Sequence, residues 1–238
     1  MKDKIKDKLE KDGKYWIVFV GDSITSCEWV HPNWREIVEY VLKEELQKVI
    51  PDWKVPSWGI RCFNHGYDGA TTKDVLEKIN EIEGLQPDLV IMMMGGNDSV
   101  LGVSEKEHGE NIKTIAKSLA DKNIDLVYST DSKPWNDKIA ELYGKYVEID
   151  KKLNLDGVRF INLFEEFDNF PKERIFTFKS EEIAVVGLKK GDIDFLHPNQ
   201  LGNAYIAKII LKEVFQIDFD PEKYIETNTA GYKYPEYQ

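Results

Sequence analysis

Ser23 is the side chain in this sequence best placed for nucleophilic chemistry. Residues 15–20 are apolar and predict a buried strand, and residues 21–25 (Gly-Asp-Ser-Ile-Thr) follow as a polar turn before a helical segment. Such a turn presents a hydroxyl at the carboxyl end of a strand. Taken alone, the serine fits a turn or helix-cap role better, because glycine, aspartate and serine are ordinary turn residues.

A serine hydroxyl needs a neighbouring base, and the chain contains four histidines: His31, His65, His108 and His197. The first precedes a proline and could line a pocket, the second sits in a turn, and the third falls in a polar helical stretch and is expected to be solvated. His197 follows Asp194 by three residues, a spacing at which one turn brings carboxylate and imidazole together. The carboxylate would accept from Nδ1–H and leave Nε2 facing Ser23. We therefore take His197 as the base.

The elements that must position these groups alternate along the chain. Strands are predicted at 15–20, 58–64, 88–94, 124–130 and 158–163, and helices at 34–49, 71–83, 104–120, 135–153 and 201–215. Repeated strand–helix units favour parallel pairing with helices on both faces of the sheet. The turns after the strands then meet at one edge, where open α/β sheets build their sites.

Several local signals refine this picture. Thr71 with Asp74, and Ser104 with Glu107, are candidate capping boxes. Residues 89–94 are continuously apolar, as expected of a strand covered on both faces, so their three methionines are interpreted as core. Residues 171–190 lack a clear period and lead into Asp194 and His197, so this segment is expected to shape or cover the pocket.

Four blocks in order resemble those of the SGNH hydrolases, or GDSL-type esterases and lipases. They are residues 21–25, 64–69 (Asn-His-Gly-Tyr-Asp-Gly), 95–98 (Gly-Gly-Asn-Asp) and 194–199 (Asp-Phe-Leu-His-Pro-Asn). Each block is common, but the ordered set is specific and spans residues 17 to about 215. The resemblance implies a flavodoxin-like three-layer α/β/α sandwich with a five-stranded parallel central sheet, and hydrolysis of acyl esters.

The resemblance also implies an oxyanion hole. Its donors would be the backbone N–H groups of Ser23 and Gly69 and the side-chain amide of Asn97, aimed at the charge that develops on the substrate carbonyl. Gly69 and Asn97 also have simpler structural roles open to them. Gly69 would permit a positive φ angle, and Asn97 would tie down its own turn. Asp22 and Asp98 are expected to bind backbone groups and rigidify their loops.

The expected activity is that of a serine esterase working by a Ser23–His197–Asp194 triad through an acyl-enzyme. We expect short-acyl, acetyl, esters of a carbohydrate or small alcohol, since no long apolar lid is evident. Aromatic faces near the strand ends could contact a sugar or pack the core; they are Trp29, Trp34 and Trp135, and Trp34 fits the core better. The alternatives are a lysophospholipase or thioesterase of the same fold, an acyltransferase, and a catalytically silent module that binds a glycan or acylated ligand.

Composition bounds the remaining possibilities. The 238 residues are 42% hydrophobic, enough for one domain over 1–238, with a charged N-terminal helix at 1–13 and a Tyr-rich tail at 218–238. The tail could wrap the body, contact another subunit or stay disordered. A net charge of −11 argues against nucleic acid as a partner.

No apolar run approaches the roughly 20 residues of a membrane span, and the first residues do not form a secretory signal, so a cytoplasmic location is expected. Cys27 and Cys62 are expected to be free thiols. We expect no cofactor, and no metal site because the histidines are scattered and no cysteine pair has zinc spacing. Homo-oligomerisation is left open.

Overall fold

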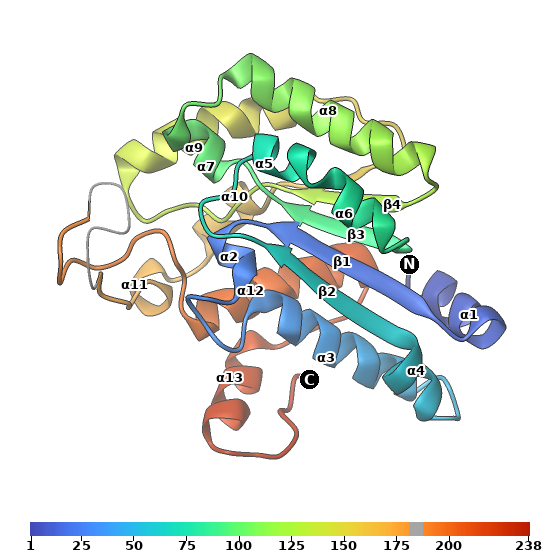
Figure 1. Ribbon diagram of the computed structural model, residues 1–238. Helices are drawn as coiled ribbons and strands as arrows, with labels where there is room; N and C mark the ends of the chain where they lie inside the picture. Colours follow the sequence, from blue (N-terminus) through green and yellow to red (C-terminus); the bar gives the residue numbers. More distant parts are fainter. Residues whose placement is uncertain (181–187) are drawn as a thin grey trace.

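The computed structural model describes residues 1–180 and 188–238 and is built on one sheet of parallel strands (Figure 1). The strand order is β2-β1-β3-β4-β5, with β1 (Tyr15–Gly21), β2 (Ile60–Gly66), β3 (Leu89–Met93), β4 (Asp125–Ser129) and β5 (Arg159–Ile161). This is the flavodoxin-like order. The chain runs outward from β1 to β2 and then crosses back to β3, so β1 and β3 flank the point where the winding reverses.

Helices cover both faces of the sheet. They are α1 (Lys2–Asp12), α2 (Ser23–Ser26), α3 (Trp34–Gln47), α4 (Lys54–Gly59), α5 (Thr72–Glu77), α6 (Ile79–Gly84), α7 (Gly96–Leu101), α8 (Glu105–Asp121), α9 (Asp137–Asp150), α10 (Leu163–Glu166), η1 (Phe167–Asn169), α11 (Lys172–Ile175), α12 (Gln200–Ile210), the π-helical turn η2 (Leu211–Phe215) and α13 (Pro221–Thr229). Helices α3 and α12 pack on one face, and α5, α6 and α8 on the other (Figure 1). None of the helices in residues 1–180 and 188–238 is both long and apolar enough to cross a membrane.

The central strands supply side chains to two separate cores. Ile17 and Phe19 of β1 pack towards α3 and α12, whereas Val18 and Val20 pack towards the opposite helices, and all four are at most 1% exposed. Successive residues of a strand point to opposite faces, so a strand covered on both sides must be apolar throughout. The three methionines at 92–94 alternate in the same way and are fully buried, which confirms their interpretation as core.

The boundaries of several elements differ from the sequence expectation. The helix predicted over 71–83 is two helices, because the chain leaves helical geometry at Lys78; its capping box between Thr71 and Asp74 is present. Ser104 caps α8 by accepting from the Glu107 amide at 3.2 Å, which is one half of the expected pair. Strand β2 starts two residues late, because Trp58 and Gly59 belong to α4. Residues at a boundary can belong to either neighbouring element, and tertiary packing decides between the two.

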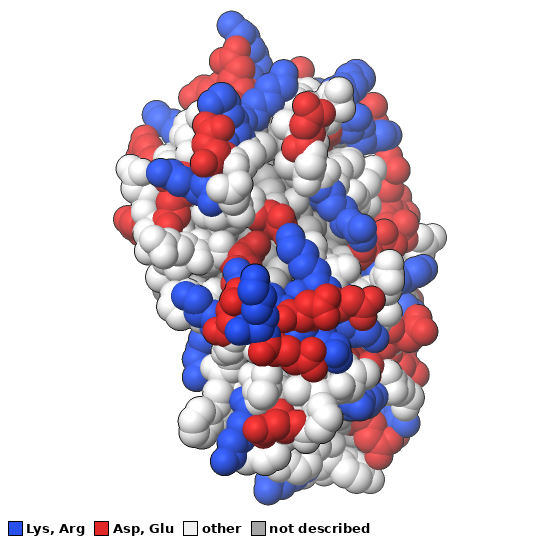
Figure 2. Space-filling view, turned by 90° about the vertical axis from the view of Figure 1, so that its right-hand side faces the viewer, with Lys and Arg blue, Asp and Glu red and all other residues white. Residues whose placement is uncertain are grey.

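Helix α1 closes the end of the sheet where the strands begin. Ile5 and Leu9 are buried, and lysines on the same helix pair with Asp88, which precedes β3, and with Asp125, the first residue of β4. Figure 2 shows this side of the molecule, with positive and negative side chains interspersed over the surface. The carboxyl ends of the strands lie at the opposite side.

The Tyr-rich tail packs against the body. Tyr237 is 8% exposed, its carbonyl accepts from the Asp220 amide at 2.9 Å, and its hydroxyl donates to Glu45 on α3. Tyr40 on α3 donates to the carbonyl of Pro235 at 3.1 Å. Of the three arrangements considered for the tail, the structure shows wrapping.

Candidate active site

Ser23 stands directly after β1, at the carboxyl edge of the sheet. Asp22 caps the single turn of α2 by accepting from the Ile24 amide at 2.9 Å. The preceding Gly21 has no room for a side chain, since an added Cβ would lie 2.2 Å from Thr25 Oγ1. Ser23 is the first residue of α2, and its side chain remains partly exposed.

His197 connects Ser23 to a buried carboxylate. Its Nε2 lies 2.9 Å from Ser23 Oγ, and its Nδ1 lies 2.6 Å from Asp194 Oδ2. The other Asp194 oxygen accepts the backbone amides of Leu196 and His197, which locks the carboxylate in place. Burial alone would raise the pKa of Asp194, but the hydrogen bond and charge of His197 and these amides hold the pKa below its ordinary value. The carboxylate therefore stays ionised beside the imidazole.

The two other residues expected at this edge lie on neighbouring turns. Gly69 has a φ of +73°, so its glycine identity is needed for backbone geometry, and within the described ranges no group accepts its N–H. Asn97 follows β3 and donates from Nδ2 to Asp22 at 3.2 Å and to the Ala70 carbonyl at 3.1 Å. The side-chain amide of Asn97 thus joins three turns at the edge and is tied to more than its own loop.

Comparison with known proteins identifies the family. The model of the GDSL-like Lipase/Acylhydrolase family matches residues 19–205, most of the chain. The chain belongs to this family. It is therefore a hydrolase of ester bonds, as the four sequence blocks indicated. No curated protein matches the sequence significantly.

Solved structures of GDSL-type and related hydrolases share the fold. A catalytic mutant of an acetylxylan esterase from Geobacillus stearothermophilus has a TM-score of 0.62 at 19% identity, covering 84% of this chain and 93% of that one. A lipolytic G-D-S-L family protein from Veillonella parvula gives 0.60 at 17%, with 85% and 100% covered. A lipase/acylhydrolase from Enterococcus faecalis gives 0.58 at 20%, with 84% and 95% covered. The three-layer α/β fold expected from the sequence is confirmed.

In this GDSL-family chain, Trp29 packs on the candidate base. Its ring stacks on His197 with centroids 3.9 Å apart and planes at 3°, and its Nε1 donates to Asp68 at 3.1 Å. The sequence left Trp29 open between contact with a sugar and packing in the core, and did not predict its place on the imidazole. Trp34 is fully buried in the core as expected. Trp135 is 43% exposed, and its amide donates to the Phe195 carbonyl at 2.9 Å, beside the segment that carries Asp194 and His197.

Asp131 is a buried acid beneath the site that the sequence analysis did not single out. It follows β4, is 3% exposed, and accepts from the Gly96 amide at 2.6 Å, next to Asn97. Its other oxygen has no hydrogen-bond partner among the described residues. Burial, and then the charge of Asp22, raise the pKa of Asp131 well above its usual range, while burial raises the pKa of Asp22 to about 6. In the sequence, the signal for Asp131 is its position just after a predicted strand, at the edge of the sheet that also carries Ser23 and Asn97.

His108 is the clearest correction to the sequence analysis, which expected it to be solvated. The side chain is fully buried, with Nδ1 2.6 Å from Asp98 and Nε2 2.9 Å from Asp150. Asp98 also accepts from the backbone and side chain of Thr72, which confirms the expectation that it binds a backbone group. Helix α8 turns His108 towards the interior, where the two acids satisfy its ring nitrogens.

Two cavities lie in different parts of the molecule, one beside Gly69 and one beside the C-terminal tail. One of about 220 Å³ adjoins Gly69 and is lined by Val20, Val75 and Ile82 together with polar residues such as His65. A larger hollow of about 710 Å³ lies beside η2 and the C-terminal tail, with none of the residues discussed above in its lining except Tyr237 and Asp220. The smaller cavity is lined by Gly69 and Ala70, residues of the turn that neighbours Asn97, but not by Ser23 or His197. The segment 171–190, expected to cover the pocket, falls partly outside the described residues.

Proposed function

We propose that this protein is a serine esterase that hydrolyses short-acyl esters, acetyl esters foremost, of a carbohydrate or small alcohol. The observation that carries the proposal is the chain of contacts from Ser23 through His197 to Asp194, at 2.9 and 2.6 Å. A hydroxyl, an imidazole and a buried carboxylate in this order are what activation of a serine requires.

In the acylation step, Ser23 Oγ attacks the ester carbonyl as its proton passes to His197 Nε2. Asp194 holds the imidazole tautomer and stabilises the imidazolium that forms. His197 then gives the proton to the departing alcohol, which leaves an acyl group on Ser23. In deacylation, His197 takes a proton from water, the hydroxide attacks the acyl carbon, and the proton returns to Ser23 as the acid leaves.

The oxyanion of each tetrahedral intermediate is assigned to three donors: the N–H groups of Ser23 and Gly69 and the Asn97 amide. Asp22 orients this amide by accepting one of its hydrogens. The hydrogen that points to the Ala70 carbonyl is the one that the oxyanion would draw. A donor that strengthens its bond as charge develops stabilises the transition state more than the substrate.

Two observations support a short acyl group on a sugar-like alcohol. The cavity adjoining Gly69 is small, about 220 Å³, and partly apolar. The exposed ring of Trp135 lies beside the segment bearing the base and stacks with Phe176, which leaves an aromatic surface for a sugar ring. One structurally similar protein is described as an acetylxylan esterase, which agrees with this substrate class.

The test is a series of p-nitrophenyl esters from acetyl to dodecanoyl, with Ser23→Ala as the inactive control. We expect kcat/KM to be highest for acetyl and to fall as the chain lengthens. A steep rise with chain length would instead favour the lysophospholipase or thioesterase alternative. Reaction with a serine-directed phosphonate should label Ser23, and a folded protein without adduct would favour the silent binding module.

The sugar contact has its own test. Trp135→Ala should raise KM for an acetylated xylo-oligosaccharide while KM for p-nitrophenyl acetate stays within about twofold, since only the former substrate reaches the ring. Equal effects on both substrates would contradict a role in binding the alcohol moiety.

A further inference from the structure

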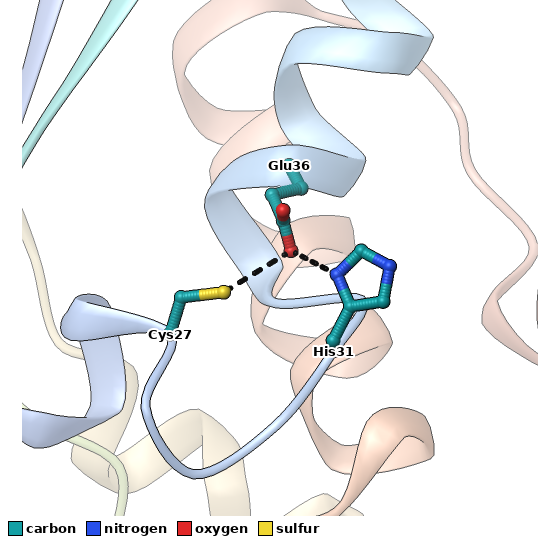
Figure 3. Close-up of side chains that lie close together, drawn as sticks. All are labelled: Cys27, His31 and Glu36. Atoms are coloured by element: carbon teal, nitrogen blue, oxygen red, sulfur yellow. Dashed lines mark hydrogen bonds and ion pairs between the residues drawn. The ribbon is translucent and has the colours of Figure 1, made fainter.

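Cys27, His31 and Glu36 bring three metal-ligand side chains together beside the active-site loop. Cys27 ends α2, His31 lies on the following loop, and Glu36 is in the first turn of α3. One donor atom from each lies within 4.8 Å of the other two. Figure 3 shows the thiol and the imidazole both directed at the Glu36 carboxylate, from opposite sides.

The spacing of these atoms suits a tetrahedral ion. With Zn–S bonds of about 2.3 Å and Zn–N and Zn–O bonds of about 2.0–2.1 Å, the edges of the tetrahedron are about 3.3–3.6 Å. Glu36 Oε2 lies 3.6 Å from Cys27 Sγ and 3.1 Å from His31 Nδ1, close to two of these edges. The His31 side chain is 77% exposed, so its ring has room to close the third edge.

We propose that Cys27, His31 and Glu36 bind a thiophilic divalent cation, for which Zn²⁺ is the best match, with a fourth position open to water. A thiolate, an imidazole and a carboxylate form a donor set of intermediate softness, which favours zinc over magnesium or calcium. On binding, the cation replaces the thiol proton, which is released to solvent, and an S–metal bond forms. The imidazole and carboxylate each donate one lone pair.

Neighbouring groups orient the Glu36 carboxylate, and one of them is expected to weaken the binding of a cation. The backbone N–H of Asn33 donates to Glu36 Oε2 at 2.8 Å as part of the α3 capping box, and such outer hydrogen bonds hold metal-ligating carboxylates in place. Arg35 is the neighbouring positive charge, and its Nε donates to the Thr25 carbonyl at 3.2 Å. We expect Arg35 to weaken cation binding, so Arg35→Gln should bind more tightly than the unchanged protein.

The cation would join both ends of the loop that carries Trp29. Residues 27 and 31 bracket Trp29, whose ring stacks on His197. A cation held by Cys27, His31 and Glu36 would fasten this loop to α3 and so restrain the ring above the imidazole. This site is separate from the Ser23 triad, and the triad needs no metal for the steps described above.

The binding test uses Co²⁺ alone as a spectroscopic probe. We expect the unchanged protein to show a sulfur-to-cobalt charge-transfer band and the d–d bands of a tetrahedral ion, with one equivalent bound and displaced by Zn²⁺. Cys27→Ser should abolish the charge-transfer band. His31→Gln and Glu36→Gln should each weaken binding by at least about 100-fold. Glutamine at position 36 can still complete the capping box, so this variant keeps the helix start.

Cys62→Ser is the matched control, because it removes the other thiol and should leave the spectrum and the affinity unchanged. Zn²⁺ at a hundredfold excess over Kd should raise Tm by about 5–10 °C in the unchanged protein and not in Cys27→Ser. The proposal is overturned if the unchanged protein shows no thiolate–cobalt band, or if Cys27→Ser binds as tightly. It is also overturned if Cys62→Ser removes the band. Neither readout requires esterase activity, so failure here is distinguishable from failure of the triad.

Discussion

Two histidines of this protein each lie 2.6 Å from an aspartate, yet their settings suit opposite tasks. His197 has one carboxylate, Asp194, on Nδ1 and a hydroxyl on Nε2, at the edge of the sheet. His108 has a carboxylate on each nitrogen and is fully buried. A proximal carboxylate is thus not enough to make an imidazole a base.

The partner of the second ring nitrogen distinguishes the two histidines. Burial lowers the pKa of His108, but hydrogen bonds and charges from Asp150 and Asp98 outweigh it and raise the pKa to about 9. An imidazole that is already protonated at neutral pH cannot accept a proton from serine. His197 keeps Nε2 directed at Ser23, so it can take the proton and return it. Substitution of either histidine should therefore separate loss of activity from loss of stability.

His197→Ala should lower kcat for p-nitrophenyl acetate by about 10⁴ to 10⁶-fold, because serine then has no base. Its Tm should fall by less than that of His108→Gln, because Asp194 keeps its hydrogen bonds from the backbone amides of residues 196 and 197. Activity comparable to the unchanged enzyme would mean that another group serves as the base.

His108→Gln should lower the stability of the protein rather than its activity. It leaves Asp98 and Asp150 without their shared cation, which should cost about 3–5 kcal/mol of unfolding free energy in urea titrations. The kcat of the folded fraction should remain within a few-fold. A large loss of kcat without loss of stability would contradict a structural role for His108.

The pH dependence of stability should follow His108. Its folded-state pKa is raised from 6.5 to about 9, so its contribution is complete below pH 6.5 and is lost as pH rises through 9. The unfolding free energy should therefore fall by up to about 3 kcal/mol over this range. His108→Gln should lack this component, and identical pH profiles for the two proteins would refute the assignment.

The smallest effect is expected at Trp29, which covers His197 but makes no contact with Ser23 in the proposed chemistry. Trp29→Ala should lower kcat/KM about 5–10-fold, because it loses a ring stack worth about 1 kcal/mol. Trp29→Phe keeps an aromatic face and loses the bond to Asp68, so it should stay within about threefold. A phenylalanine variant as impaired as the alanine variant would assign the effect to the Asp68 contact instead.

Much of the fold was predictable because its signals are local. Apolar runs such as residues 15–20 and 89–94 mark strands covered on both faces, and the strand–helix alternation leaves few topologies. The break between α5 and α6 at Lys78 carried no comparable mark, since the apolar pattern continues across it. Boundaries depend on packing between elements, which a single sequence does not display.

The residue types of the active site and their order can be read along the chain: a serine after the first strand, glycine and asparagine on two later turns, and Asp194 three residues before His197. Which imidazole meets a hydroxyl, and which is enclosed by two acids, depends on the tertiary packing. It also placed Trp29 on His197 and gathered Cys27, His31 and Glu36, a grouping that zinc-type spacing did not predict. The reason is physical: types and short spacings are encoded locally, whereas burial and distances between distant turns follow from how the layers pack.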